Sequence, residues 1–308
     1  MSLNKSLSGV LPVLQTPFTP DGDIDEAVLV QEMTWVRDQG VAGYTTGMVS
    51  EILRLDAAER QQLTEVVTDT ARSYQLLTII SAGAESTKGA IAHARHAARN
   101  GADGLMVNPP VTAQLDDTGL LEYFRAVLDS VSIPVIVQDA SGYVGRAIPI
   151  TLQATLLKEF GEQVYFKPEA TPIGPRLSML RDATDGAARV FEGTGGLALI
   201  DSHRRGIVGT MPGAELCWAI QAMWDALESG DDDKAYAISG PLSAMVSMQT
   251  TIDVFVAVEK HLLQRQGVFP STATRGPSGF RLDAETTAEV DRLFDRIHLA
   301  AMGAPALS

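Results

Sequence analysis

Residues 77–107, LTIISAGAESTKGAIAHARHAARNGADGLMV, contain the pattern that decides the fold. The short apolar run Leu77–Ser81 is followed by an alanine-rich stretch of helical period, Thr87–Arg99, and then by a second apolar run, Gly104–Val107. Two strands joined by a helix pair in parallel, because a crossover of this length returns the chain to the same end of the sheet. The segment therefore predicts one strand–helix–strand unit of a parallel sheet.

The same unit recurs along most of the chain. The predicted strands are Val10–Leu14, Ala42–Thr46, Leu77–Ser81, Gly104–Val107, Pro134–Val137, Val164–Phe166, Arg189–Phe191 and Gly206–Gly209. The predicted helices between them are Asp25–Asp38, Asp56–Ala71, Thr87–Arg99, Thr118–Ser130, Ile150–Phe160, Gly174–Ala183 and Leu197–Ser202. The helix at Asp56 begins with a capping-box pattern, because Glu59 follows three residues later.

Eight such alternations fit either a closed barrel or an open doubly wound sheet. No strong Gly-x-Gly-x-x-Gly pattern follows the first strand, which favours the barrel. From about Ala214 the pattern becomes helical, with predicted helices at Ala214–Glu228, Asp232–Met248, Ile252–Gln266 and Ala284–Leu299. The sequence therefore predicts an α/β fold, a (β/α)8 TIM barrel over residues 1–215 with a C-terminal helical extension over residues 216–308.

Composition limits the kinds of function that are open to the chain. Of its 308 residues 45% are hydrophobic and 20% charged, and no apolar run reaches the length of a membrane span. The start, Met1–Lys5, lacks the apolar stretch of a secretory signal, and the single cysteine, Cys217, excludes an internal disulfide. A net charge of -14 argues against a nucleic-acid partner. We expect a cytoplasmic protein with no membrane contact.

Lys167 is the lysine that differs from the others by its position. The lysines are Lys5, Lys88, Lys158, Lys167, Lys234 and Lys260. Lys88, Lys158, Lys234 and Lys260 fall in helical patterns with polar neighbours, so we expect solvated charges there. Lys167 instead closes the apolar run at residues 164–166, at the strand end where barrels of this type place their chemistry.

Two interpretations of Lys167 remain open from the residues alone. A lysine removed from water favours the neutral amine that attack on a carbonyl group requires. Alternatively, the side chain extends from the barrel rim and pairs with a carboxylate such as Glu169. The turn at residues 45–51, TTGMVSE, is equally open: its backbone N–H groups could hold a carboxylate, or Gly47 could serve an ordinary turn.

The chain resembles the dihydrodipicolinate synthase / N-acetylneuraminate lyase family of class I aldolases and dehydratases. The matching segments, in order along the chain, are Leu14–Phe18, Gly47–Glu51, Leu55, Glu59-Arg60, Phe166-Lys167, Gly193 and Gly206–Gly209. The resemblance covers roughly residues 8–215, and the helical tail fits the family too.

The resemblance implies a role for each matching position. It implies that Lys167 forms an imine with a 2-oxo acid and that the turn at Met48, Val49 and Ser50 holds the substrate carboxylate. The remaining expected pocket residues are Gly193 and Val208. The resemblance also implies a homotetramer. No metal or organic cofactor is expected, because the lysine itself supplies the electrophilic catalysis.

Departures from the family pattern narrow the expected activity. The family's strand-five Tyr-Asn-x-Pro motif is here Gln138-Asp139-Ala140-Ser141, its Thr-Thr pair is Met48-Val49, and its Tyr pair after strand four is Pro110-Val111. The proton relay of the synthase is therefore missing. Gln138 makes the chain similar to the 2-keto-3-deoxy-sugar-acid dehydratases, where we expect it to orient a water or a substrate hydroxyl.

The resemblance, with these departures, thus implies imine-based dehydration or aldol cleavage of a 2-keto-3-deoxy sugar acid. Tyr143, Glu169 and a substrate hydroxyl are the candidate proton carriers. Two alternatives stay open: a synthase-like or other pyruvate-dependent aldolase, and a non-catalytic paralogue that binds a 2-oxo acid. His93 and His96 lie three residues apart on a predicted helix, but no third ligand is in view, so no metal site is expected.

Overall fold

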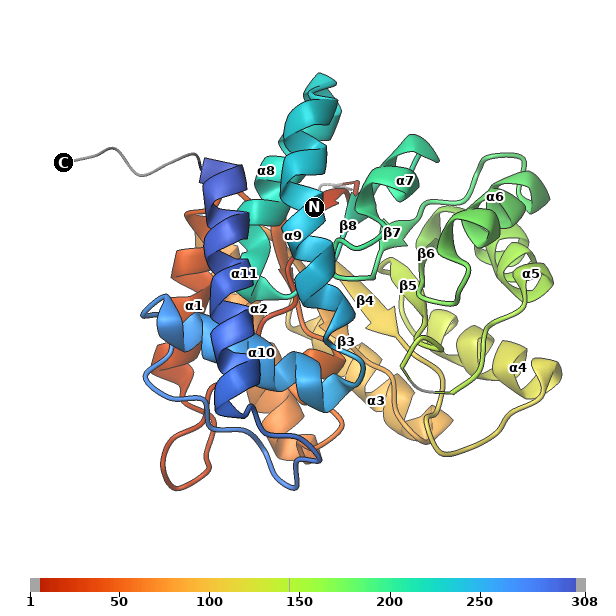
Figure 1. Cartoon of the computed structure of the whole chain (residues 1–308). Helices are drawn as coiled ribbons and strands as arrows, with labels where there is room; N and C mark the ends of the chain where they lie inside the picture. Colours follow the sequence, from red (N-terminus) through yellow and green to blue (C-terminus); the bar gives the residue numbers. More distant parts are fainter. Residues whose placement is uncertain (1–5, 144, 303–308) are drawn as a thin grey trace.

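The computed structural model describes residues 6–143 and 145–302, so Met1–Lys5 lies outside the described residues. Strands and helices alternate as predicted. The strands are β1 Gly9–Val10, β2 Gly43–Thr45, β3 Leu77–Ser81, β4 Gly104–Val107, β5 Val135–Asp139, β6 Val164–Pro168, β7 Phe191–Glu192 and β8 Gly209–Thr210. The helices after them are α1 Glu26–Arg37, α2 Ala57–Tyr74, α3 Thr87–Arg99, α4 Asp117–Leu128, α5 Ile150–Phe160, α6 Ile173–Ala183 and α7 Leu199–Arg204 (Figure 1).

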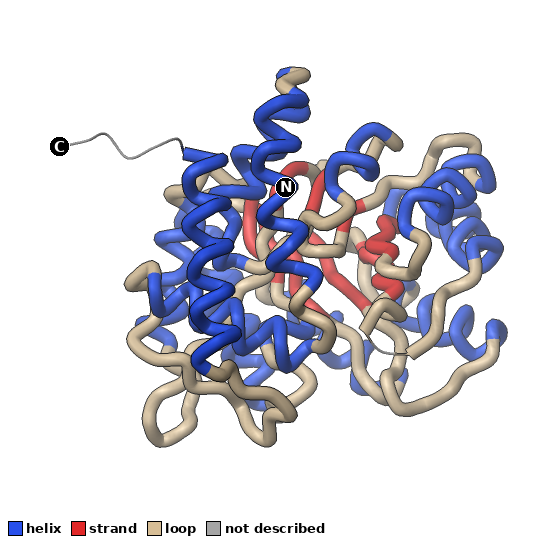
Figure 2. Tube along the Cα trace, viewed as in Figure 1, coloured by secondary structure: helices blue, strands red, loops and turns tan. Residues whose placement is uncertain are grey.

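The strands close into a barrel. All of their pairings are parallel, in two groups ordered β1-β8-β7 and β2-β3-β4-β5-β6. Parallel bridges between Val13 and Thr45 and between Phe166 and Val190 join the two groups at both edges. The structure is therefore the predicted (β/α)8 barrel, with helices around the strands (Figure 2).

Among the predicted strands, β3 and β4 have the bounds expected, and the first and the last strand differ most from the prediction. Regular pairing in β1 stops at Val10 rather than continuing to Leu14, and Pro12 in that stretch has no N–H to donate to a neighbouring strand. The last strand begins at Gly209 rather than Gly206, because Gly206 is still in a turn with a φ of +84°. The predicted capping box of α2 is confirmed: Asp56 accepts from the N–H of Glu59, whose side chain accepts from the N–H of Asp56.

Side chains alternate between the inside and the outside of the barrel. Ile136 and Tyr165 belong to the cluster that fills the interior, whereas Val135, Val137, Val164 and Phe166 belong to the cluster that includes the surrounding helices. The period of two then places the next inward positions at Gln138 on β5 and Lys167 on β6. The two residues are also partners in the parallel register. The fold therefore brings Gln138 and Lys167 together inside the barrel end.

The C-terminal part is helical, as predicted. It contains the 3-10 turn η3 Ala214–Leu216 and the helices α8 Cys217–Ser229, α9 Asp232–Ser247, α10 Ile252–Arg265 and α11 Ala284–Met302. Helices α8, α9 and α11 pack together, while α10 packs on the turn η1, Met48–Ser50. The division at residue 215 stays a prediction. Among the described helices, none is long and apolar enough to cross a membrane.

Candidate active site

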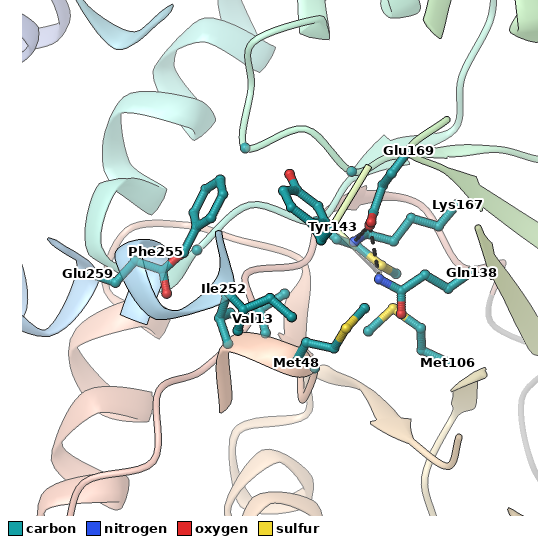
Figure 3. A pocket seen from close by; sticks show the side chains of 16 residues that line it. Val13, Met48, Met106, Gln138, Tyr143, Lys167, Glu169, Ile252, Phe255 and Glu259 are labelled. Atoms are coloured by element: carbon teal, nitrogen blue, oxygen red, sulfur yellow. Dashed lines mark hydrogen bonds and ion pairs between the residues drawn. The ribbon is translucent and has the colours of Figure 1, made fainter. Parts of the chain in front are cut away.

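A pocket opens at the carboxyl ends of the strands, with α10 along one side (Figure 3). It is lined by residues from seven of the strand ends and from α10: Val13, Gly47, Met48, Val49, Met106, Gln138, Tyr143, Lys167, Glu169, Gly193, Gly195, Met211, Gly213, Ile252, Phe255 and Glu259. Most of this lining is apolar or glycine, with a few convergent polar groups, which is the usual make-up of a small-molecule site.

Lys167 lies in this pocket and is nearly removed from water, with 5% of its surface exposed. Its Nζ donates a hydrogen bond to Glu169 Oε1, and Glu169 itself is 3% exposed. The structure thus contains a feature of each interpretation: Lys167 is removed from water, as the first requires, and it pairs with Glu169, as the second requires. Burial raises the pKa of Glu169, and the positive charge of Lys167 opposes that rise.

Gln138 contacts Glu169 from the neighbouring strand. Its Nε2 donates to Glu169 Oε1 at 2.9 Å, the same oxygen that Lys167 contacts. The other carboxyl oxygen, Oε2, is buried without a hydrogen-bond partner in the structure. Gln138 therefore fixes the orientation of Glu169 and leaves one oxygen of that carboxyl group free for a further proton or ligand.

The turn after β2 places two of its three predicted residues at the pocket. Met48 and Val49 line it, whereas Ser50 does not. The Ser50 hydroxyl accepts from the N–H of Gly47 at 3.0 Å and donates to the carbonyl of Leu14 at 2.5 Å. Ser50 therefore holds the turn in shape, and its side chain is not available to a substrate.

Gly193 lines the pocket as expected, and Val208 does not. A Cβ on Gly193 would lie 2.9 Å from both Lys167 Cε and Glu169 Oε1, so any side chain there would displace the pair. Val208 comes before β8 and packs against the apolar barrel interior. The carboxyl end of β8 lies further along the chain, so Met211 takes the place that the family resemblance implied for Val208.

Sequence patterning does not reveal the pocket residues that α10 contributes. Ile252, Phe255 and Glu259 come from a helix that the pattern places in the tail, and only the folded chain brings them over the barrel. Phe255 meets Tyr143 edge to face, with ring centroids 5.4 Å apart. Burial raises the pKa of the Tyr143 hydroxyl, which therefore keeps its proton and can donate it to a hydrogen bond.

Lys260 is not the solvated residue that the sequence pattern predicts. It is 0% exposed, and its Nζ donates to Glu51 Oε1 at 2.5 Å, Thr16 O at 2.8 Å and Ala273 O at 2.6 Å. Helical periodicity could not reveal this, because the partners come from distant segments of the chain. The contact ties α10 to the pocket turn, since Glu51 directly follows η1.

Metal ligation is not indicated by the described part of the chain. Among residues 6–143 and 145–302, no group of three or more His, Cys, Asp or Glu side chains is arranged to hold an ion. His93 is half-buried on α3, and burial lowers its pKa to about 4. His96 lies 3.4 Å from Glu65 Oε1.

The chain is similar in sequence to a synthase and to a dehydratase of known name. A 4-hydroxy-tetrahydrodipicolinate synthase of Methanosarcina mazei is 28% identical over 204 residues, covering 65% of this chain and 68% of that one. An L-2-keto-3-deoxyarabonate dehydratase of Azospirillum brasilense is 25% identical over 287 residues, covering 92% of each.

Solved structures show the same fold. YagE, a prophage protein of E. coli K12 solved in complex with pyruvate, superposes with a TM-score of 0.86 at 23% identity, over 96% of this chain and all of the other. A dihydrodipicolinate synthase of Rhodopseudomonas palustris superposes with a TM-score of 0.85 at 24% identity. The superposition covers 94% of this chain and 97% of the other. The model of the dihydrodipicolinate synthetase family matches residues 6–296, nearly the whole length, and this chain therefore belongs to that family of lyases.

Proposed function

We propose that this protein is a Schiff-base-forming lyase that acts on a 2-keto-3-deoxy sugar acid through Lys167. The observation that carries the proposal is the buried Lys167 amine at the strand end, against Glu169. Of the two lysines that the described residues bury, Lys167 lines the pocket and Lys260 does not, and carbonyl attack requires an amine that can lose its proton.

The chemistry begins with transfer of a proton from Lys167 to Glu169. The neutral amine attacks C2 of the 2-oxo acid, and the carbonyl oxygen leaves as water to give an iminium ion. Burial raises the pKa of Glu169, which makes this carboxyl group a better proton acceptor than an exposed one and suits it to take up and return protons. Glu169 is therefore the proposed proton carrier in place of the family tyrosine.

The iminium ion then allows either of two reactions. Loss of a proton from C3 to Glu169 gives an enamine, and the C4 hydroxyl then leaves as water with that proton. A water molecule hydrolyses the resulting iminium ion, which releases the dehydrated 2-oxo acid and restores Lys167. Loss of the C4 hydroxyl proton with breakage of the C3–C4 bond instead gives an aldehyde and the enamine of pyruvate. The Azospirillum dehydratase, which matches 92% of this chain, supports dehydration. A synthase-like aldolase is the second candidate, favoured by the Methanosarcina relative.

The substrate carboxylate is proposed to bind at the turn of Met48 and Val49. The first N–H groups of a 3-10 turn have no acceptor within the turn, so they can donate to an anion. Val49 lines the pocket beside Met48, which places this turn within it. The homotetramer and the cytoplasmic location implied earlier stay predictions, as does the non-catalytic alternative.

Borohydride trapping tests the proposed function. The protein is incubated with pyruvate and sodium borohydride, and the intact mass and the peptide map are then measured. We expect a reduced pyruvate adduct on Lys167 that is absent without borohydride. Folded protein without an adduct would remove the basis for the lyase and favour the binding paralogue.

Glu169→Gln is expected to slow the exchange of the pyruvate methyl protons with deuterium about 10²–10⁴-fold. The amide cannot accept the proton, although it keeps the shape of the carboxyl group. In the wild type, the exchange rate should fall as the pH drops through the pKa of Glu169, above the ordinary 4.5, because the base becomes protonated. Proton NMR in deuterated buffer measures both effects.

The control for this variant is Glu159→Gln, the same change at an exposed position on α5, which should leave the exchange rate within about twofold. A Glu169→Gln protein that exchanges within tenfold of wild type, with an unchanged acid limb, would show that Glu169 is not the proton carrier.

A further inference from the structure

The pocket has two polar ends, and a basic side chain lies at one of them. Lys167, Glu169 and Gln138 form one group, and Figure 3 shows Glu259 on the opposite side, beyond Ile252 and Phe255. Among the described lining residues, Lys167 is the sole basic side chain, and its Nζ already contacts Glu169. The end of the pocket at Glu259 therefore offers a carboxyl group and no cation.

Glu259 is held in place from behind by residues of the barrel. It is 2% exposed, and its Oε2 accepts from Gln15 Nε2 at 2.5 Å. Its other oxygen, Oε1, lies beside Gly213, a pocket-lining residue, where an added Cβ would come within 2.6 Å of it. One oxygen is thus engaged by Gln15, while the other is next to the pocket.

Two further buried carboxyl groups surround Glu259. Glu215 Oε2 also lies against Gly213 and has no hydrogen-bond partner in the structure, and Glu32 Oε1 accepts from the N–H of Gln15 at 2.9 Å. Lys260, the next residue along the chain, is engaged by Glu51, Thr16 and Ala273. Burial, reinforced by the neighbouring acids, raises the pKa of Glu259, and burial raises that of Glu215 to about 7.

A protonated carboxyl group in this place can donate one hydrogen bond and accept another. An alcohol has the same dual capacity, so a hydroxyl group is a matched partner. A carboxylate or phosphate would instead be buried beside acids with no cation to compensate it, which is strongly unfavourable. The chemistry at this end of the pocket thus favours an uncharged hydroxyl over an anion.

We propose that Glu259 binds a distal hydroxyl of the substrate, so that the enzyme accepts sugar acids ending in an alcohol and rejects those ending in a carboxylate or a phosphate. The inference rests on the proposed function, because it assumes that Lys167 holds the 2-oxo end. It assigns Glu259 as a specificity residue, contributed by the helical extension rather than by a barrel strand.

The test compares three six-carbon compounds that differ only at the far end: 2-keto-3-deoxygluconate, its 6-phosphate and 2-keto-3-deoxyglucarate. We expect the wild type to turn over the alcohol-ended compound with a kcat/KM at least about 100-fold above the two anionic ones. Comparable kcat/KM values for all three would overturn the proposal.

Variants of Glu259 separate recognition from a structural role. Glu259→Leu should lower kcat/KM for the alcohol-ended compound about 10–100-fold, mainly by raising KM. This loss should be at least about tenfold larger than the loss in the rate of pyruvate methyl exchange. Glu259→Gln should recover most of the loss, because an amide also donates and accepts. The matched control is Gln264→Leu on the exposed face of α10, which should change neither rate.

Equal loss of turnover and pyruvate exchange in Glu259→Leu, without rescue by Glu259→Gln, would assign Glu259 a structural role and overturn the inference. Failure of the proposed function is distinguishable from this result, because the wild type would then form no borohydride adduct on Lys167. In that case both proposals fall together.

Discussion

Replacing Lys167 with methionine is expected to abolish the borohydride adduct and to lower pyruvate methyl exchange by at least about 10⁴-fold. Methionine has nearly the length of lysine without the amine, so the iminium ion cannot form and the C3 protons keep their ordinary acidity. Intact mass after reduction and proton NMR in deuterated buffer measure the two losses on the same sample.

The fold is expected to survive this change. Methionine fits the apolar part of the pocket, and Glu169, left without its cation, can take up a proton because burial already raises its pKa. Lys158→Met on the exposed side of α5 is the matched control and should retain full exchange. Exchange above about one per cent of wild type in folded Lys167→Met protein, as monitored by circular dichroism, would contradict a mechanism through this lysine.

Local patterning placed Lys167 at the end of a strand, and the family resemblance added Gln138 and the expected roles of both residues. Apolar runs end at Lys167 and Gln138, and the period of two in β5 and β6 places both side chains inside the barrel. The barrel itself follows from the repeated strand–helix unit. The family resemblance implied Val208 as a pocket residue, but β8 begins only at Gly209, so Met211 lines the pocket instead.

Long-range contacts could not be predicted in the same way. Lys260 and Glu51 are 209 residues apart, and Gln15 and Glu259 are 244 apart. The sequence "VEKHLLQ" at residues 258–264 fits a surface helix as well as a buried one, because one charged face can meet either solvent or another charged group. The acidic end of the pocket is therefore a property of how α10 packs on the barrel.

Lys260→Met is expected to lower the free energy of unfolding by about 3–5 kcal/mol. The change removes the donor to Thr16 and Ala273 and leaves Glu51, which is fully buried, without the cation that compensates it. Glu51 keeps the Arg275 N–H at 2.7 Å and Arg54 at 4.0 Å, which is a weaker set of partners. Urea unfolding at a fixed protein concentration measures the shift.

The double variant Lys260→Met with Glu51→Gln separates the charge from the packing. Neutralising Glu51 removes the uncompensated anion, so the double variant should be more stable than Lys260→Met alone if the loss is electrostatic. Lys158→Met should shift stability by less than about 0.5 kcal/mol. The turn η1 ends at Glu51, the partner of Lys260. Loss of this ion pair should therefore loosen η1 and raise the KM for 2-oxo acids, whose carboxylate we propose to bind at Met48 and Val49. A Lys260→Met protein with wild-type stability would show that the tie between α10 and the pocket turn contributes nothing to the fold.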